Sequence, residues 1–141
     1  MRLKILLFLL FLVPVVTAQE WIFLDSGVTN DLNSISCPNE QTCYVAGGAP
    51  YIGGNAVILK TEDAGENWVS QPLPTTSPLR GIDCVDERTC FAAGGEILKT
   101  VNGETWTIAD DRDAILWDVD ATNSTHAVAV GNLGTKLRTV D

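Results

Sequence analysis

Three stretches of this 141-residue chain repeat one sequence pattern, and this internal repetition limits the possible folds more than any other feature. The clearest element is ILKT, which occurs at residues 58–61 and again at 97–100, with KLRT as its third version. Each of these runs follows two other apolar runs in the same order, the second of which ends in glycine. The chain therefore divides into three units, at about 32–73, 74–110 and 111–141.

Every unit has the composition of antiparallel strands joined by tight turns. Short runs rich in β-branched and aromatic residues alternate with Gly, Asn, Asp and Pro, and no stretch after residue 18 has the periodicity of an amphipathic helix. A four-stranded unit of about 40 residues cannot bury both of its faces alone, so successive units must stack face to face. We expect an all-β fold in which residues 19–141 form tandem four-stranded antiparallel blades, as in a β-propeller.

The sequence just after residue 18 adds one more strand to this count. WIFL at residues 21–24 resembles the runs that begin at Trp68 and Trp106, so it is predicted to be the fourth strand of a blade. About three blades result, whereas closed propellers typically have about four to eight. Three explanations remain open. The chain is a piece of a longer propeller, which we favour, or copies assemble through unpaired blade edges to complete a ring, or the fold is a threefold one such as a β-trefoil.

Two turn segments have a pattern with a specific structural purpose. TEDAGENW and the shorter TVNGETW resemble the Asp box, Ser/Thr-x-Asp-x-Gly-x-Thr-Trp. In this pattern an Asp or Asn accepts hydrogen bonds from turn amides, Gly adopts a positive φ, and the indole fills the gap between neighbouring blades. We assign these structural roles to Thr61, Asp63, Gly65, Trp68, Thr100, Asn102, Gly103 and Trp106.

The repeats and the two boxes together resemble the BNR/Asp-box β-propeller superfamily over almost the whole chain after residue 18. Their rhythm is most similar to that of photosystem II assembly and stability factor-like proteins, and sortilin-type and sialidase-type propellers share the box. The resemblance implies a rigid disc that presents loops to a partner, and it is more specific for the fold than for the function. It also implies two alternative functions: an assembly or stability factor for a membrane complex, and a fragment of a sialidase-like glycoside hydrolase.

Four cysteines occur as two pairs with the same spacing, and four cysteines allow three connectivities. In the third unit the equivalent positions are Ala121 and Ala127, so both members of the pair change together, as expected for partners within one hairpin. A zinc site is the alternative. We predict two local disulfides in an oxidising compartment, Cys37–Cys43 and Cys84–Cys90.

Residues 1–18 have the organisation of a secretory signal peptide. Two basic residues are followed by an unbroken apolar run at 5–13, and small residues precede a cleavage site after Ala18. An uncleaved membrane anchor is the alternative, but the apolar run is shorter than the roughly 18 residues that a spanning helix needs. We expect a secreted or surface-displayed protein without membrane insertion after cleavage. In that compartment Asn123, which begins an NST sequon, is a candidate glycosylation site.

The charge of the chain limits its partners. Acidic residues number 18 against 9 basic ones, which gives a net charge of −9, and cleavage of the leader would also remove Arg2 and Lys4. Such a surface disfavours nucleic acid. We predict no cofactor and no metal. The carboxylates clustered at residues 110–113 are a candidate calcium site, with a solvated linker as the favoured alternative.

The residues that catalysis would need are not found in a recognisable arrangement. A sialidase-like site needs several convergent arginines and a tyrosine nucleophile with a glutamate partner. After the leader only four arginines remain, and His126 has no nucleophile near it in the sequence. We predict that the chain is not an enzyme and has no catalytic residues. The glycoside hydrolase alternative would place those residues in blades outside this sequence.

Recognition residues are expected where the repeats differ, because the shared positions maintain the fold. Asn33, Arg80 and Trp117 align at the start of the innermost strand of each unit and are predicted to line the mouth of the central channel. Tyr51, in the glycine-rich insertion at 47–55, is predicted to add an exposed aromatic residue on the same face. These four residues are the candidate binding site for a protein or glycan partner.

Overall fold

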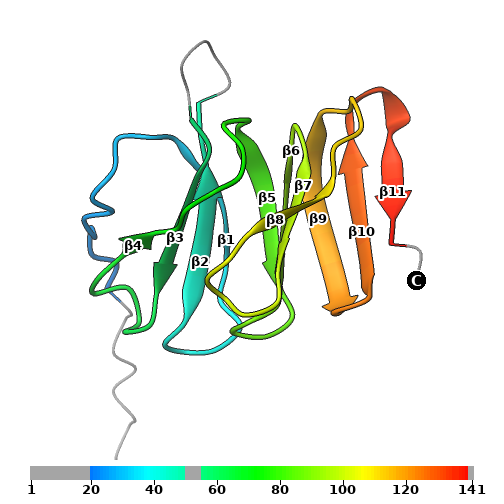
Figure 1. Ribbon diagram of the computed structural model, residues 1–141. Coiled ribbons are helices and arrows are strands. Elements are labelled where there is room, and N and C mark those ends of the chain that lie inside the picture. Colours follow the sequence, from blue (N-terminus) through cyan, green and yellow to red (C-terminus); the bar gives the residue numbers. More distant parts are fainter. Residues whose placement is uncertain (1–19, 50–54, 140–141) are drawn as a thin grey trace, which may run out of the picture.

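The computed structural model describes residues 20–49 and 55–139, where the chain forms three antiparallel sheets that we call blades 1, 2 and 3 (Figure 1). Blade 1 contains β1 (Leu32–Ser36), β2 (Cys43–Gly47), β3 (Val57–Thr61) and β4 (Val69–Ser70). Blade 2 contains β5 (Leu79–Cys84), β6 (Cys90–Gly94), β7 (Ile97–Thr100) and β8 (Thr107–Asp110). Blade 3 contains β9 (Leu116–Asn123), β10 (His126–Gly131), a short 3-10 helix at Asn132–Gly134, and β11 (Lys136–Arg138).

Each blade is a meander in which consecutive strands pair with one another. Alternate residues of a strand point to opposite faces, so the apolar runs can bury one face against each neighbouring blade. The innermost strands β1, β5 and β9 contact one another in that order, and the blades stack side by side (Figure 1). The all-β expectation is confirmed. The β-trefoil alternative is wrong, because strand pairing within the described residues stays inside each blade.

Blades 1 and 2 bury one continuous apolar cluster between them. Tyr44 and Ile58 extend from blade 1, and Ile82, Leu98 and Trp106 are among the blade 2 residues that meet them. Fully burying a large apolar side chain stabilises a fold by about 1.5–3 kcal/mol. This cluster is therefore a major source of stability for the pair of blades.

Blades 2 and 3 bury a second cluster with smaller side chains. Phe91 and Ala93 of blade 2 face Leu116, Val119 and Ala129 of blade 3. In the described part of the chain, blade 2 is covered on both faces, whereas its two neighbours are each covered by another blade on one face only.

Residues 21–24 do not form a strand in the single chain. The expectation that they are the fourth strand of one of its blades is therefore wrong. Trp21 is 95% exposed and Phe23 is fully exposed. The physical reason is that blade 3, the blade with only three strands in the described residues, is out of reach. The segment lies beside β4 at one end of the stack, and the edge strand β11 of blade 3 lies at the other end (Figure 1).

The β3–β4 turn is closed by side-chain hydrogen bonds of the kind that the Asp-box pattern predicts. The Gly65 N–H donates to the Thr61 hydroxyl oxygen at 3.0 Å, and the Asn67 N–H donates to an Asp63 carboxylate oxygen at 2.9 Å. Gly65 has a φ of 94°. The turn also contains one residue more than its counterpart, and Ala64 adopts a left-handed φ of 60° to accommodate it.

The β7–β8 turn makes equivalent contacts with one residue fewer. The Gly103 N–H donates to the Thr100 hydroxyl oxygen at 3.1 Å, and the Thr105 N–H donates to the Asn102 side-chain oxygen at 2.8 Å. Asn102 therefore replaces Asp63 of the first turn as an acceptor without carrying a charge.

The first hairpin of blades 1 and 2 is bridged by the predicted disulfides. The Cα atoms are 4.1 Å apart in Cys37–Cys43 and 4.0 Å apart in Cys84–Cys90. In blade 3, Ala121 and Ala127 are opposite each other at the same point of the hairpin. The zinc alternative is wrong, because all four cysteines of the chain are bonded in pairs.

No helix within residues 20–49 and 55–139 is long and apolar enough to cross a membrane. The predicted signal peptide at residues 1–18 lies outside the described residues, so its cleavage stays a prediction.

Candidate functional site

Asn33, Arg80 and Trp117 form a row across the innermost strands of the three blades, which we call the inner-strand row. The Asn33 side-chain amide donates to the Leu79 carbonyl oxygen at 2.7 Å, directly before Arg80. The guanidinium carbon of Arg80 lies 4.7 Å from the centroid of the Trp117 ring, which is a cation–π contact. Trp117 remains 54% exposed, so the row presents an aromatic surface to solvent.

Each residue of the inner-strand row is the extra residue of a β-bulge. The register of β1 steps from Leu32 to Ser34 where its partner strand advances by one residue, and β5 does the same around Arg80. In β9 the skipped residue is Trp117. A bulged residue leaves the regular ladder and its side chain is re-aimed. The three positions can therefore differ between blades without disturbing the apolar core.

The Arg80 guanidinium is available to an anionic group. The ion pairs found within the described ranges are Lys60 with Glu62 and Arg112 with Asp110, and neither involves Arg80. A guanidinium presents its N–H donors in a planar fork that matches a carboxylate. Because the group lies over the Trp117 ring, part of its orientation is already fixed before a ligand arrives.

The insertion that contains Tyr51 begins and ends close to the inner-strand row. Tyr51 itself lies outside the described residues. Before it, the Gly48 carbonyl oxygen accepts a hydrogen bond from the Asn33 amide at 3.3 Å. After it, the Asn55 carbonyl oxygen accepts one from the Asn30 amide at 3.1 Å. Both contacts attach the insertion near the start of β1, and the role of Tyr51 stays a prediction.

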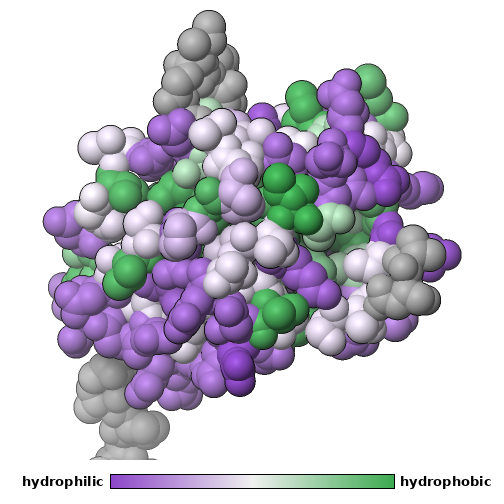
Figure 2. All heavy atoms as spheres, in the orientation of Figure 1, coloured by the Kyte–Doolittle hydropathy of each residue, from purple (hydrophilic) through white to green (hydrophobic). Residues whose placement is uncertain are grey.

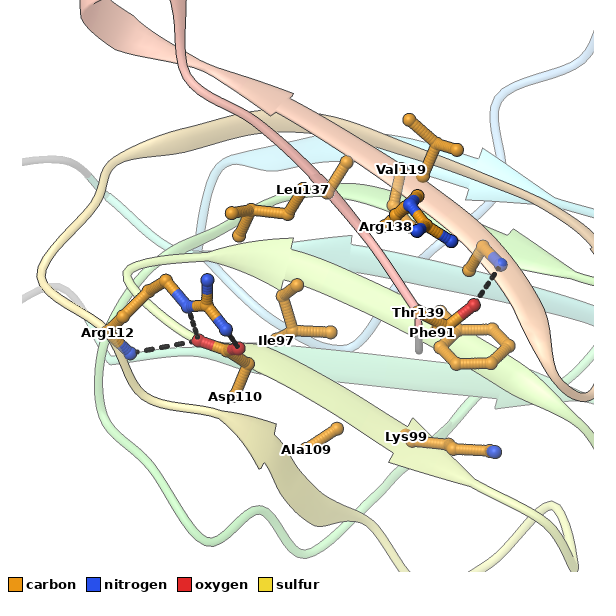
Figure 3. Close-up of a pocket in the computed structure, with 13 residues that line it drawn as sticks. Phe91, Ile97, Lys99, Ala109, Asp110, Arg112, Val119, Leu137, Arg138 and Thr139 are labelled. Atoms are coloured by element: carbon orange, nitrogen blue, oxygen red, sulfur yellow. Dashed lines mark hydrogen bonds and ion pairs between the residues drawn. The ribbon is translucent and has the colours of Figure 1, made fainter. Parts of the chain in front are cut away.

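A cavity of about 320 Å³ lies between blades 2 and 3, and we call it the interblade cavity (Figure 3). Phe91 and Ile97 of blade 2 and Leu137 of blade 3 give it an apolar lining. Lys99 lies 5.0 Å above the Phe91 ring and donates a hydrogen bond to the Ser124 carbonyl oxygen at 2.7 Å. Figure 2 shows the face of the protein that is seen in Figure 1. Hydrophilic side chains cover much of this face, and hydrophobic side chains lie between them. No motif in the sequence predicts this cavity.

The acidic run at 110–113 borders the interblade cavity. The Arg112 Nε–H donates to an Asp110 carboxylate oxygen at 2.8 Å, and this hydrogen bond lowers the pKa of Asp110. Within the described residues, no group of three or more His, Cys, Asp or Glu side chains is arranged to hold a metal ion. The carboxylate of Asp110 is therefore paired with Arg112. In this part of the chain no set of ligands is arranged to bind the calcium ion of the alternative interpretation.

The four arginines that follow residue 18 do not converge on one point. Arg80 is in the inner-strand row, Arg88 lies in the turn between β5 and β6, and Arg112 and Arg138 line the interblade cavity. His126 is exposed, and its ring Nδ1 lies 2.9 Å from a neighbouring threonine hydroxyl. The described residues thus give no cluster of arginines of the kind that would clamp a sialic acid carboxylate.

Asn123 is exposed at the hairpin between β9 and β10, where a glycan would have room. Its side-chain oxygen accepts hydrogen bonds from the N–H groups of Thr125 and His126, both at 2.9 Å. Glycosylation of Asn123 stays a prediction.

Comparison with known proteins gives a structural likeness but no family. No protein-family model matches the chain, and no curated protein matches it. One similar solved structure is described as "YCF48 bound to D1 peptide", with a TM-score of 0.69 and 19% sequence identity. The match covers 85% of this chain and 40% of that chain. At this low identity the likeness shows the fold alone, which is that of neighbouring β-propeller blades.

Proposed function

We propose that this chain is a noncatalytic propeller unit that acts outside the cytoplasm and recognises a protein partner through the inner-strand row. The observation that carries the proposal is the Arg80 guanidinium held 4.7 Å above the exposed Trp117 ring, without an ion pair among the described residues. Trp and Arg side chains are among the types that contribute most to binding energy at protein interfaces. The favoured ligand is an extended peptide segment that offers one carboxylate to Arg80 and an apolar side chain to Trp117.

Two further observations agree with a peptide ligand. The net charge of −9 repels strongly acidic segments, so one well-placed carboxylate fits better than many. The structural neighbour described as bound to a D1 peptide is a propeller that holds a peptide, although the match covers only 40% of it. An assembly factor for a membrane complex would be a special case of the same proposal, with a membrane protein as the source of the peptide.

The extracellular location is supported by the signal peptide pattern and by the two disulfides, which persist in oxidising compartments. Expression of the full chain in a secretory host should release a product whose first residue is Gln19. N-terminal sequencing of the medium fraction checks this, and retention of the whole product in the cytoplasm contradicts it.

A peptide-display library screened against the full chain tests the recognition proposal. Enriched peptides should share an Asp, a Glu or a free C-terminal carboxylate, and Arg80→Ala should weaken their binding by roughly 10-fold or more. Trp117→Ala should have an effect of similar size. The matched control is Arg88→Ala, because this arginine is in a turn between strands and away from the row.

Two outcomes of this screen would overturn the peptide proposal. If no peptide is enriched, or if enriched peptides bind the Arg80→Ala variant as well as the unchanged protein, the inner-strand row is not a peptide site. If the protein instead binds glycans on an array, with the same dependence on Arg80, the partner is a glycan and not a protein.

A further inference from the structure

The two interfaces between blades differ by one aromatic side chain. Between blades 1 and 2, the Trp106 ring meets the Tyr44 ring edge-on, with centroids 6.3 Å apart, and Trp106 is only 3% exposed. Phe91 occupies the position of Tyr44 in the next blade, since Tyr44 pairs with Lys60 in the strand register as Phe91 pairs with Lys99. Both lysines lie over the ring of their partner.

No described residue supplies an indole that packs on Phe91 as Trp106 packs on Tyr44. The interblade cavity of about 320 Å³ lies against Phe91 instead (Figure 3). The Phe91 ring borders the cavity, with Lys99 and the β11 residues Leu137 and Arg138 around it. The cavity therefore lies between blades 2 and 3 at the position that corresponds to that of Trp106 between blades 1 and 2.

The strand edge beside the cavity is also unoccupied. β11 pairs with β10 through Val128 opposite Arg138, Ala129 opposite Leu137 and Val130 opposite Lys136. Within the described residues no strand pairs with the other edge of β11, whereas β3 and β7 carry β4 and β8 at this position. An unpaired edge presents a row of backbone donors and acceptors to any strand of suitable sequence.

The chain itself contains a segment with the matching sequence. WIFLD at residues 21–25 aligns with WTIAD at 106–110, which forms the turn and strand that supply Trp106 and β8. In the structure this segment is unpaired, and Trp21, Ile22 and Phe23 are 95%, 72% and 107% exposed. Large apolar side chains that are this exposed mark an interaction site.

We propose that residues 21–25 of a second copy of this chain add to β11 as the fourth strand of blade 3 and insert Trp21 into the interblade cavity. The pairing of β7 with β8 sets the register, since Lys99 is opposite Thr107 and Ile97 is opposite Asp110. By the same register Arg138 lies opposite Ile22 of the second copy. Lys136 then lies opposite its Asp25, which places opposite charges side by side.

The faces of the outer blades fit the same arrangement. Ile35 of blade 1 is 59% exposed, although the equivalent Ile82 and Val119 are only 4% and 5% exposed. Val128 and Val130 of blade 3 are 49% and 46% exposed. A second copy that inserts Trp21 would bring its blade 1 against blade 3 of the first copy, so that these apolar residues become buried.

Within one copy, residues 21–25 are far from β11. The segment and β11 lie at opposite ends of the stack of blades (Figure 1). The contact is head-to-tail, and such contacts close into a ring when the rotation between copies permits. Two copies would hold about six blades, which is within the range of about four to eight blades in closed propellers.

Sedimentation of the full chain over a range of concentrations tests this proposal. The unchanged protein should associate reversibly, and Trp21→Ala should raise the dissociation constant by about 30-fold or more. Val101→Ala, which changes an exposed apolar residue in the β7–β8 turn of blade 2, should associate normally. Lys136→Asp should weaken association, and Lys136→Asp together with Asp25→Lys should restore it.

A cross-link identifies the occupant. A variant with Ile22→Cys and Arg138→Cys should form dimers linked by a new disulfide, while Ile22→Cys with Leu133→Cys should not. A cross-link within one monomer would show that the strand comes from the same chain. Any one of three results overturns the proposal: this cross-link within one monomer, a monomeric protein at every concentration, or unchanged association of the Trp21→Ala variant. Peptide binding by the Trp21→Ala variant is measured separately. If the variant still binds peptide, a failure of the self-association proposal is distinguished from a failure of the inner-strand row.

Discussion

At the scale of single residues, Asp63 and Asn102 perform the same task with different charges. The carboxylate of Asp63 accepts hydrogen bonds from the Asn67 N–H, the Asn67 side-chain amide and the Thr61 hydroxyl. The bonds from Asn67 contribute most, and together these donors lower the pKa of Asp63 to about 2. Asn102 is neutral and cannot respond to pH in this range.

This difference predicts how stability depends on pH. The Asp63 carboxyl has an ordinary pKa of 3.8 in an unfolded chain and a pKa of about 2 in the folded protein, so its contribution is complete above about pH 4. It is lost as the pH falls from about 4 to about 2. Asp63→Asn should therefore flatten the decline of the unfolding free energy in this window, and Asn102→Asp should steepen it. Urea denaturation at several pH values checks both, and an unchanged slope in Asp63→Asn contradicts the assignment.

Trp106 and Trp68 have equivalent places in the sequence but different surroundings. Trp106 is 3% exposed between two blades, whereas Trp68 is half-buried on the outer face of blade 1. Trp106→Ala should lower the unfolding free energy by about 3–5 kcal/mol and Trp68→Ala by about 1–2 kcal/mol. The indole N–H of Trp106 is buried without a partner among the described residues, so Trp106→Phe should cost less than Trp106→Ala. Chemical denaturation measures all three, and equal losses for the two alanine variants would contradict the difference in packing.

The turn residues were predictable from the sequence, whereas the exact nature of the inner-strand row was not. Thr61, Gly65 and their counterparts follow from a short pattern whose hydrogen bonds are local. Alignment of the repeats located Arg80 and Trp117, but a bulge depends on the register between two strands. Nothing in the local sequence shows that register, so the reason for the grouping emerged only in three dimensions.

At the scale of elements, the first hairpin of each blade allows a controlled comparison. Cys90 is fully buried and Cys84 nearly so, while Cys37 is exposed. Replacing either cysteine pair by alanine should cost about 2 kcal/mol, because the closed loops are short, and the buried pair should cost about 1 kcal/mol more for lost packing. Urea denaturation of the two double variants measures this. Blade 3 already has Ala121 and Ala127 at this point, so the hairpin should still form.

Treatment with a reductant supplies the control for the disulfide comparison. Dithiothreitol should lower the stability of the unchanged protein and leave a variant without any cysteine unaffected. A larger loss for the exposed pair than for the buried pair would contradict the packing argument.

Elements that pair with their sequence neighbours were predictable, and the one that needs a distant partner was not. Residues 21–24 have the composition of a strand as clear as that of β8. A strand exists only where an edge accepts it, and the edge in question lies at the far end of the stack. The interblade cavity has the same origin, since it lies where the first interface has a tryptophan.

At the scale of the whole molecule, the stack of three blades predicts a gradient of local stability. Blade 2 is covered on both faces, so amides of β6, whose residues are all buried, should exchange with solvent roughly 100-fold or more slowly than those of β11. Hydrogen-exchange mass spectrometry on the full chain measures this difference. Equal protection in all blades at low concentration would contradict the gradient. If copies join through β11, its protection should rise with protein concentration while that of β6 stays constant, because only β11 gains a new partner strand.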